Sequence, residues 1–428
     1  MTMSSAEMVI LPNKGFKFTE DFFLLFCEKN SDGTKHLRLR GKELYQRIGQ
    51  RLSHMDMLAV SLFLRDHLEI ISLDLCYNNI GDVGVQILVE NYFEYKNTLV
   101  DLNLIFNDLS YLALSELYRT SKNMRLRTLR LTGNKFGKKG GEYVAKLIES
   151  LPTLELVELG DTDQVLPSID AILETTKKSN LKVLDISRVL PKSEYEILNP
   201  SWLAKNVGLF LEVNKILTEL HMEKCELDGH DVEKLMNGMM YNTSLKLLNL
   251  ACNRIGSYGM KILAKWLSEK PPLQGLDVSH NQISDHGARA LSFGMCYSRL
   301  KFLNISYNRI GDDGIACILD TLKKPYQMRL FFFYGNPFGP KSLKIVKRMI
   351  LSGVLEQKYI DTKLYEVDGE LKAAYYPTNH FKQQYYSVMM HGFPEVLKIK
   401  RNVVEPPNEK RRPFFFLPYY ERYQPLDD

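Results

Sequence analysis

The chain has 428 residues, of which 45% are hydrophobic and 25% charged, and its formal net charge at pH 7 is +5. These fractions are ordinary for a soluble protein, and so mild a charge does not by itself predict nucleic-acid binding. None of the six cysteines forms a C-x-x-C pair, which argues against a zinc site and suits free thiols in a reducing compartment.

Residues 1–67 are expected to form an N-terminal extension and cap. No basic-then-apolar segment resembles a signal peptide, and the most apolar stretch, Phe22 to Cys27, is too short to span a bilayer. Within the cap, Gly41 to Leu64 is expected to be helical and His36 to Arg40 to form a degenerate extra strand. We therefore expect no membrane association and a cytoplasmic or nuclear location.

Residues 68–352 repeat one pattern. The stretches IISLDLCYNNIGDVG from Ile70 and LKFLNISYNRIGDDG from Leu300 share the frame L-x-x-L-x-L-x-x-N-x-I-G-x-x-G. Most copies lie about 27 to 29 residues apart, a period that indicates a stacked solenoid. The ten copies start at these anchor residues: Ile70, Leu99, Leu126, Leu154, Leu181, Leu217, Leu245, Leu273, Leu300 and Met328.

Each letter of the frame has a structural role. The L-x-L core predicts a short strand whose leucines face the core, because strand side chains alternate between two faces. The Asn amide satisfies backbone groups where the strand ends, and glycine suits the tight turn before a helix, such as Asp313 to Lys323. We therefore predict an α/β solenoid shaped like a horseshoe, with about ten repeats, parallel strands on the concave face and helices on the convex face.

The middle of the repeated region is irregular. Thr162, Val189 and Cys225 replace the asparagine, and the gap between the last two is lengthened by a segment near 190–200 that contains two prolines. This segment is either a tolerated insertion in a surface connection or a loop that contacts a partner.

Residues 353–428 leave the repeat pattern and are expected to form an aromatic and basic C-terminal tail. Tyrosine and phenylalanine are too dense here for a typical solvated linker. The tail is either an ordered strap packed on the last repeats or a docking segment that folds on a partner. Two basic clusters within 398–413, KIKRN and EKRRP, weakly resemble a nuclear localisation signal.

The N-x-I-G-x-x-G frame with its following helix resembles the ribonuclease-inhibitor-like class of leucine-rich repeats. The matching residues include Asn78, Ile80, Gly81 and Gly84 in one copy, and equivalent residues follow Asn253, Asn281 and Asn308. The layout of cap, repeats and non-repeat tail is similar to the leucine-rich repeat-containing protein 34 group. That resemblance implies a nucleolar, stem-cell or ciliary role, whereas likeness to the Ran GTPase-activating protein of the same class implies regulation of a small GTPase.

Function is expected on the concave face, at the third, fifth and seventh position of each repeat, where side chains point away from the helices. Acids predominate there, and the last repeat adds an aromatic pair that is either an exposed anchor or is covered by the tail. The candidate partner-binding residues are Asp74, Asp101, Glu158, Asp185, Glu219, His221, Glu223, Asp277, Phe332 and Tyr334. A protein with a basic surface fits this face, and nucleic acid does not, because carboxylates repel phosphates.

No catalytic motif is present, so the chain is not expected to be an enzyme or to need a cofactor or metal. Glu219, His221 and Glu223 share one face of a strand, but without a fourth converging ligand a polar face is preferred to a metal site. The leading hypothesis is a monomeric interaction scaffold that binds a protein partner. The alternatives are a regulator of a small GTPase and a structural component of a ciliary or nucleolar assembly.

Overall fold

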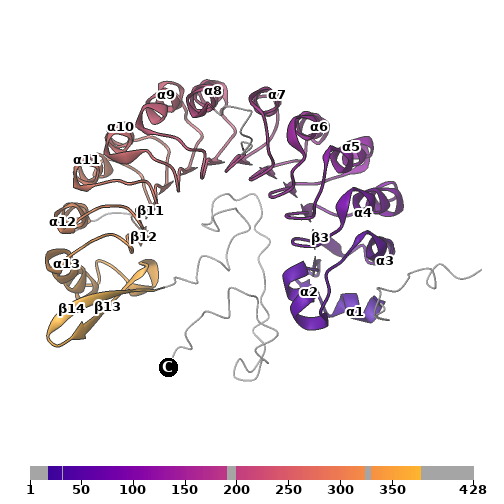
Figure 1. Ribbon diagram of the computed structural model, residues 1–428, viewed down its shortest axis with the longest axis horizontal. Helices are drawn as coiled ribbons and strands as arrows, with labels where there is room; N and C mark the ends of the chain where they lie inside the picture. The colour runs from indigo at the N-terminus through magenta and orange to yellow at the C-terminus, as the bar shows by residue number, and fades with distance from the viewer. Residues whose placement is uncertain (1–17, 31, 190–198, 323–327, 329, 377–428) are drawn as a thin grey trace, which may run out of the picture.

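The computed structural model describes residues 18–30, 32–189, 199–322, 328 and 330–376. The chain forms a horseshoe in which a curved sheet lines the inside and helices line the outside (Figure 1). The predicted α/β solenoid is thus confirmed. The loop expected near 190–200 lies largely outside the described residues, as do the basic clusters of the tail.

The main sheet has twelve strands that follow one another in chain order. The first two are antiparallel, and every later neighbouring pair is parallel. The strands are β1 (Cys27–Lys29), β2 (Lys35–Arg38), β3 (Ile70–Asp74), β4 (Asp101–Asn103), β5 (Thr128–Arg130), β6 (Leu156–Glu158), β7 (Val183–Asp185), β8 (Glu219–His221), β9 (Leu247–Asn249), β10 (Gly275–Asp277), β11 (Phe302–Asn304) and β12 (Leu330–Phe332).

A helix follows most strands and returns the chain to the start of the next one. The α-helices are α1 (Glu20–Leu24), α2 (Gly41–Ile48), α3 (Met57–Asp66), α4 (Gly81–Leu88), α5 (Tyr111–Arg119), α6 (Gly137–Ser150), α7 (Leu166–Thr176), α8 (Pro200–Val213), α9 (Gly229–Met239), α10 (Gly256–Ser268), α11 (Asp285–Met295), α12 (Asp312–Thr321) and α13 (Pro340–Leu351). Short 3-10 turns lie at His54–Asp56, Ser121–Asn123 and Gln357–Tyr359, and a π-turn at Val89–Phe93 continues α4.

The N-terminal cap contributes directly to the sheet. The extra strand expected at His36 to Arg40 is present as β2, which pairs in parallel with β3, and α2 and α3 account for most of the expected helical segment. Phe23 packs its ring on Phe63 of α3 at 5.0 Å between centroids. The sheet therefore begins within the expected cap.

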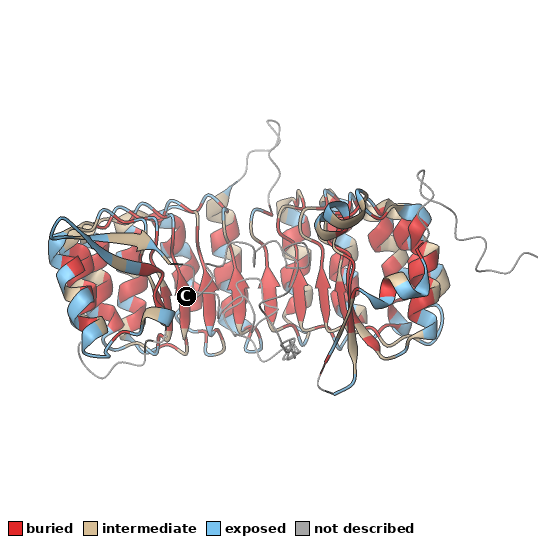
Figure 2. Cartoon of the chain, turned by 90° about the horizontal axis from the view of Figure 1, so that it is seen from below, coloured by how far each residue is buried: buried red, intermediate tan, exposed pale blue. Residues whose placement is uncertain are grey.

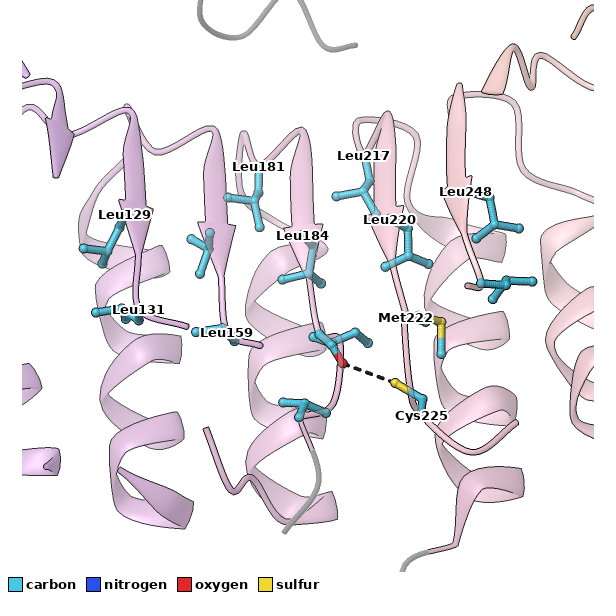
Figure 3. Close-up of a cluster of buried hydrophobic side chains, with 14 of the residues drawn as sticks. Leu129, Leu131, Leu159, Leu181, Leu184, Leu217, Leu220, Met222, Cys225 and Leu248 are labelled. Carbon is cyan, nitrogen blue, oxygen red and sulfur yellow. Dashed lines mark hydrogen bonds between the residues drawn. The ribbon is translucent and has the colours of Figure 1, made fainter. Parts of the chain in front are cut away.

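The core lies between the sheet and the helices, as the frame predicts. Leu217, Leu220 and Met222 are the anchor, fourth and sixth residues of one repeat, and all three are completely buried. Equivalent leucines of neighbouring repeats lie beside them in rows that run across the strands (Figure 3). Each repeat thus buries its apolar side against its two neighbours.

The asparagine that ends the strand ties each repeat to the one before it. Asn253 donates from Nδ2 to the carbonyls of Met222 and Leu250, both at 2.9 Å. Its Oδ1 accepts from the amides of Cys225 at 3.0 Å and Leu227 at 3.1 Å. All seven asparagines donate to a carbonyl of the preceding repeat or, for Asn78, of the cap: Asn78, Asn107, Asn134, Asn253, Asn281, Asn308 and Asn336.

These asparagine hydrogen bonds, here called the asparagine ladder, are interrupted in the irregular middle of the solenoid. Cys225 still reaches the preceding repeat, through an Sγ contact of 3.4 Å to the carbonyl of Ile186 (Figure 3). Thr162 donates only to Leu159 of its own repeat, at 2.7 Å. The Val189 side chain has no hydrogen-bonding atom. These three repeats are therefore joined mainly by strand pairing and apolar packing.

One feature of the turn is absent from the sequence frame. The residue just before the asparagine position is left-handed in all ten repeats: Tyr77, Phe106, Gly133, Asp161, Arg188, Lys224, Cys252, His280, Tyr307 and Gly335. A non-glycine residue in this conformation costs about 1 kcal/mol. The tolerance of eight such residues shows that the ladder and the packing impose the turn.

The C-terminal end of the sheet is capped by a hairpin. Strands β13 (Thr362–Val367) and β14 (Glu370–Tyr375) are antiparallel, and Ile360 just before them bridges to Phe331 of β12. The Asp361 carboxylate accepts from the backbone amides of Phe333 at 2.9 Å and Tyr334 at 3.2 Å. This carboxylate takes over the Phe333 amide, which a further repeat would otherwise bond in the way that Phe332 accepts from the Ile305 amide.

The ladder predicts unequal costs of substitution. Asn253→Ala leaves several buried backbone groups unsatisfied, so the free energy of unfolding should fall by about 3 kcal/mol. Thr162→Val removes one hydrogen bond and should cost about 1 kcal/mol. Urea denaturation followed by circular dichroism measures both. Equal losses in the two variants would contradict the role of the ladder.

Candidate functional site

Six of the candidate residues form a row along the concave face, here called the concave acidic cluster: Asp101, Glu158, Asp185, Glu219, His221 and Asp277. Strand pairing sets their order, because Glu158 is opposite Asp185 and Asp185 is opposite His221. Neighbouring strands are about 4.8 Å apart, so these charged groups are close together.

The cluster is buried. Each of its residues, and Asp74 beside it, is at most 5% exposed, whereas Glu223 at a strand end is half-buried. The strands appear as a row of buried segments when the molecule is turned by 90° (Figure 2). Sequence reasoning missed this burial, although the third-position residues Leu156, Val183, Leu247 and Phe302 on the same face gave a signal of it.

Acids near the N-terminal end have matched partners. Asp74 forms an ion pair with Arg40 at 2.5 Å, and Arg40 and His36 hold its pKa below the ordinary value although burial opposes this. Asp101 accepts from the hydroxyls of Ser72, at 2.5 Å, and Thr128. Charge at this end is therefore largely satisfied by the protein itself.

The centre of the cluster has more carboxylates than cations. Arg130 pairs with Glu158 at 2.6 Å, yet burial, with Asp185 nearby, raises the pKa of Glu158 to about 7. Glu219 Oε1 lies 2.5 Å from His221 Nε2. Burial would lower the pKa of His221, but the carboxylates of Glu219, Asp185 and Glu158 outweigh it and raise that pKa.

One atom at this centre lacks a donor. Glu219 Oε2 is buried and has no hydrogen-bond partner among the described residues. Burial raises the pKa of Glu219, and the neighbouring Asp185 adds to this against the effect of His221. An orphaned carboxylate oxygen in a dry site is a place where a cationic or N–H donor would bind.

Asp277 marks the C-terminal end of the cluster. Its carboxylate accepts from Ser279, at 2.9 Å from the amide and 2.7 Å from the hydroxyl, and from Asn304 Nδ2 at 2.7 Å. These neutral donors do not offset burial, which raises the pKa of Asp277 to about 6.

The terminal aromatic pair is half-buried. Phe332 packs edge-on against Phe302 with ring centroids 5.6 Å apart, and Tyr334 contacts Tyr375 of β14 at 5.4 Å. The hairpin thus contacts Tyr334, and each ring of the pair stays partly exposed.

The described residues hold no group of three or more His, Cys, Asp or Glu side chains placed to bind a metal. His221 and Glu219 form a buried pair, while Glu223 lies at the strand end beside Lys224, at 3.5 Å between Nζ and Oε1. In the part of the chain that the structure describes, no helix combines the length and apolar character needed to cross a membrane.

Comparison with known proteins agrees with the repeat geometry. A leucine-rich-repeat family model matches residues 70–89, 122–145, 241–264, 270–292 and 299–319. The chain contains leucine-rich repeats. Its repeats are of the ribonuclease-inhibitor-like kind predicted from the N-x-I-G frame.

Two curated proteins illustrate the similarity. Leucine-rich repeat-containing protein 34 of Mus musculus is 30% identical over 238 residues, which cover 55% of this chain and 56% of that protein. Ribonuclease inhibitor of Sus scrofa is 25% identical over 261 residues, covering 59% and 55%. This leucine-rich-repeat chain spans about half the length of the curated relatives it matches. A solved internalin of Listeria monocytogenes has a TM-score of 0.37 at 13% identity, covering 76% of this chain and 86% of that one.

Burial of Asp277 predicts a specific dependence of stability on pH. Because its pKa is raised from 3.8 to about 6, the protonated form is favoured in the folded state. The resulting stabilisation, about 3 kcal/mol, is complete below pH 3.8 and is lost as pH rises through 6. Asp277→Asn cannot ionise, so its free energy of unfolding should fall less between about pH 4 and pH 7.

Urea denaturation across this pH range measures the slope in the wild type and in Asp277→Asn. The exposed α6 variant Glu142→Gln, which changes charge equally, should keep the wild-type slope. Parallel slopes for all three proteins would contradict the effect of burial.

Proposed function

We propose that this leucine-rich-repeat protein is a non-enzymatic scaffold that binds a basic segment of a protein partner through the concave acidic cluster. The observation that carries the proposal is the orphaned Glu219 Oε2 at the centre of a row of buried carboxylates. Lysine or arginine supplies the missing donor and offsets the charge that burial disfavours.

The face also favours a particular kind of basic segment. Leu156, Val183, Leu247 and Phe302 lie on the same face of the strands as the carboxylates, because strand side chains alternate. A partner with apolar or aromatic residues between its cations matches both kinds of side chain. Nucleic acid is disfavoured, since its phosphates would face carboxylates.

The partner sites named from the sequence divide into three groups under this proposal. The binding centre consists of Glu158, Asp185, Glu219, His221 and Asp277, with Glu223 at its solvent-facing edge. Asp74 and Asp101 have matched partners within the protein and shape the face. Phe332 and Tyr334 form its aromatic end, where the hairpin contacts Tyr334.

Monomeric state, and a cytoplasmic or nuclear site of action, are part of the same proposal. Regulation of a small GTPase and a structural role in a ciliary or nucleolar assembly stay predictions, because no contact among the described residues favours either.

Neutralising the binding centre tests the proposal. The combined variant Asp185→Asn, Glu219→Gln and Asp277→Asn keeps side-chain size and removes three negative charges. It should bind a basic partner at least tenfold more weakly, because the partner's cations lose the carboxylates with which they pair. Its binding should also depend less on salt, because fewer charges meet across the interface. Affinity capture from cell extract with quantitative mass spectrometry identifies the proteins affected, and titration calorimetry measures each affinity.

The matched control removes the same number of charges from the convex helices: Glu142→Gln, Glu149→Gln and Glu212→Gln, all at exposed positions. It should retain every partner that the wild type retains. If the concave variant, folded as judged by circular dichroism, also retains them all, the concave acidic cluster is not the binding site.

A further inference from the structure

The concave face combines buried apolar side chains with a buried carboxylate. Val183 and Leu247 are completely buried on the same face as Glu219, whose Oε2 has no donor among the described residues. A dry surface of this composition selects an occupant that carries both cations and large apolar groups.

The described part of the chain ends at the edge of this face. Strand β14 pairs Tyr375 with Thr362, next to the residues that bridge to β12. The Tyr375 ring contacts Tyr334 of the last repeat, and the Tyr376 amide donates to the Asp361 carbonyl at 2.9 Å. Tyr376, the last described residue, therefore lies next to the last repeat.

The segment 377–428 is long enough to reach the acidic centre. Strands β12 and β8 are four strand spacings apart, or about 20 Å. The 22 residues from Tyr376 to Lys398 span up to about 70 Å when extended, since each residue adds about 3.3 Å. Length therefore does not restrict contact of the basic residues with any strand between β12 and β8.

The segment also has the complementary composition. Between Lys398 and Arg412 it carries six lysines and arginines against two glutamates. Phe414, Phe415 and Phe416 follow at once, and several tyrosines lie on either side of the basic stretch. Cations next to aromatic rings are what the carboxylates and apolar residues of the face would bind.

We propose that residues 377–428 fold back within the same chain and occupy the concave acidic cluster until a protein partner displaces them. The segment is then an autoinhibitory competitor of the partner. The competition with a partner rests on the proposed function. The intramolecular contact does not.

Zero-length carbodiimide coupling of the full-length protein tests that contact without any partner. Lys398, Lys400 and Lys410 should form amide bonds mainly with Glu223 and the neighbouring cluster carboxylates. We expect coupling at least tenfold more frequent than to Glu142, Glu149 and Glu212 on the convex helices. Mass spectrometry of an equal mixture of light and heavy isotope-labelled protein identifies the bonds.

Each other outcome overturns the proposal. Bonds that join a light to a heavy chain would assign the face to a second copy of the protein. Coupling of the three lysines mainly to convex carboxylates, or to none, would place the segment elsewhere.

A charge variant in the full-length chain gives a second readout. Lys410→Ala, Arg411→Ala and Arg412→Ala together should speed chymotrypsin cleavage at Phe414 to Phe416 by about fivefold, because a released segment is cut faster. The control Lys122→Ala, Lys178→Ala and Lys261→Ala removes three exposed charges from elsewhere and should leave the rate unchanged. Equal rates in the two variants would overturn the proposal.

Failure of this inference is distinguishable from failure of the proposed function. If coupling places the segment off the face while the neutralised cluster still loses its partners, only the autoinhibitory contact is wrong. If coupling places the segment on the face while partners ignore the cluster, the proposed function is wrong and the contact stands.

Discussion

The asparagine amide that ends each strand is the interaction on which the rest of this molecule depends. Its amide group satisfies backbone groups of two successive repeats, as Asn253 does for Met222 and Cys225 of the preceding repeat and for Leu250 of its own. Buried backbone groups need partners, so this single side chain fixes the end of the strand in the seven repeats that carry it. Curvature, and therefore the geometry of the concave face, follows from that repeated unit.

The parallel strands of the repeats also hold charged side chains close together on the concave face, which lowers the stability of the fold. Parallel strands hold Glu158, Asp185 and His221 on adjacent rungs, where they cannot move apart. At the N-terminal end Arg40 neutralises Asp74, whereas Glu219 at the centre keeps a carboxylate oxygen that no described residue bonds. Burial raises the pKa of Glu158 and Asp277, which shows that the folded protein tolerates these anions rather than gaining stability from them.

The repeat frame predicted the architecture because each repeat depends only on local spacing. The anchors and asparagines located ten strands, and His36 to Arg40 was recognised as an eleventh parallel strand despite its weak match. Contacts between distant positions were not predictable in the same way. Asp361 caps amides 27 and 28 residues earlier, and nothing in its neighbourhood marks that role.

The candidate site was also predictable in its local features and not in those that depend on distant residues. Its residue types and their order came from the column of fifth positions, since alternation along a strand is a local rule. Their burial depends on what lies around the whole face, which the acids alone do not reveal. The left-handed turn residues were also missed, because chemically unrelated side chains such as Tyr77, Arg188 and Cys252 share one conformation that neighbouring repeats impose.

The three repeats without asparagine lack the side-chain link that joins the other repeats. Thr162 bonds within its own repeat, Val189 has no side-chain bond, and Cys225 reaches the preceding repeat through its sulfur. Glu158, Asp185 and Glu219 lie in these same repeats. An opening of the horseshoe between these repeats would change the spacing of these carboxylates, so the curvature of the arc and the charge on its inner face are coupled.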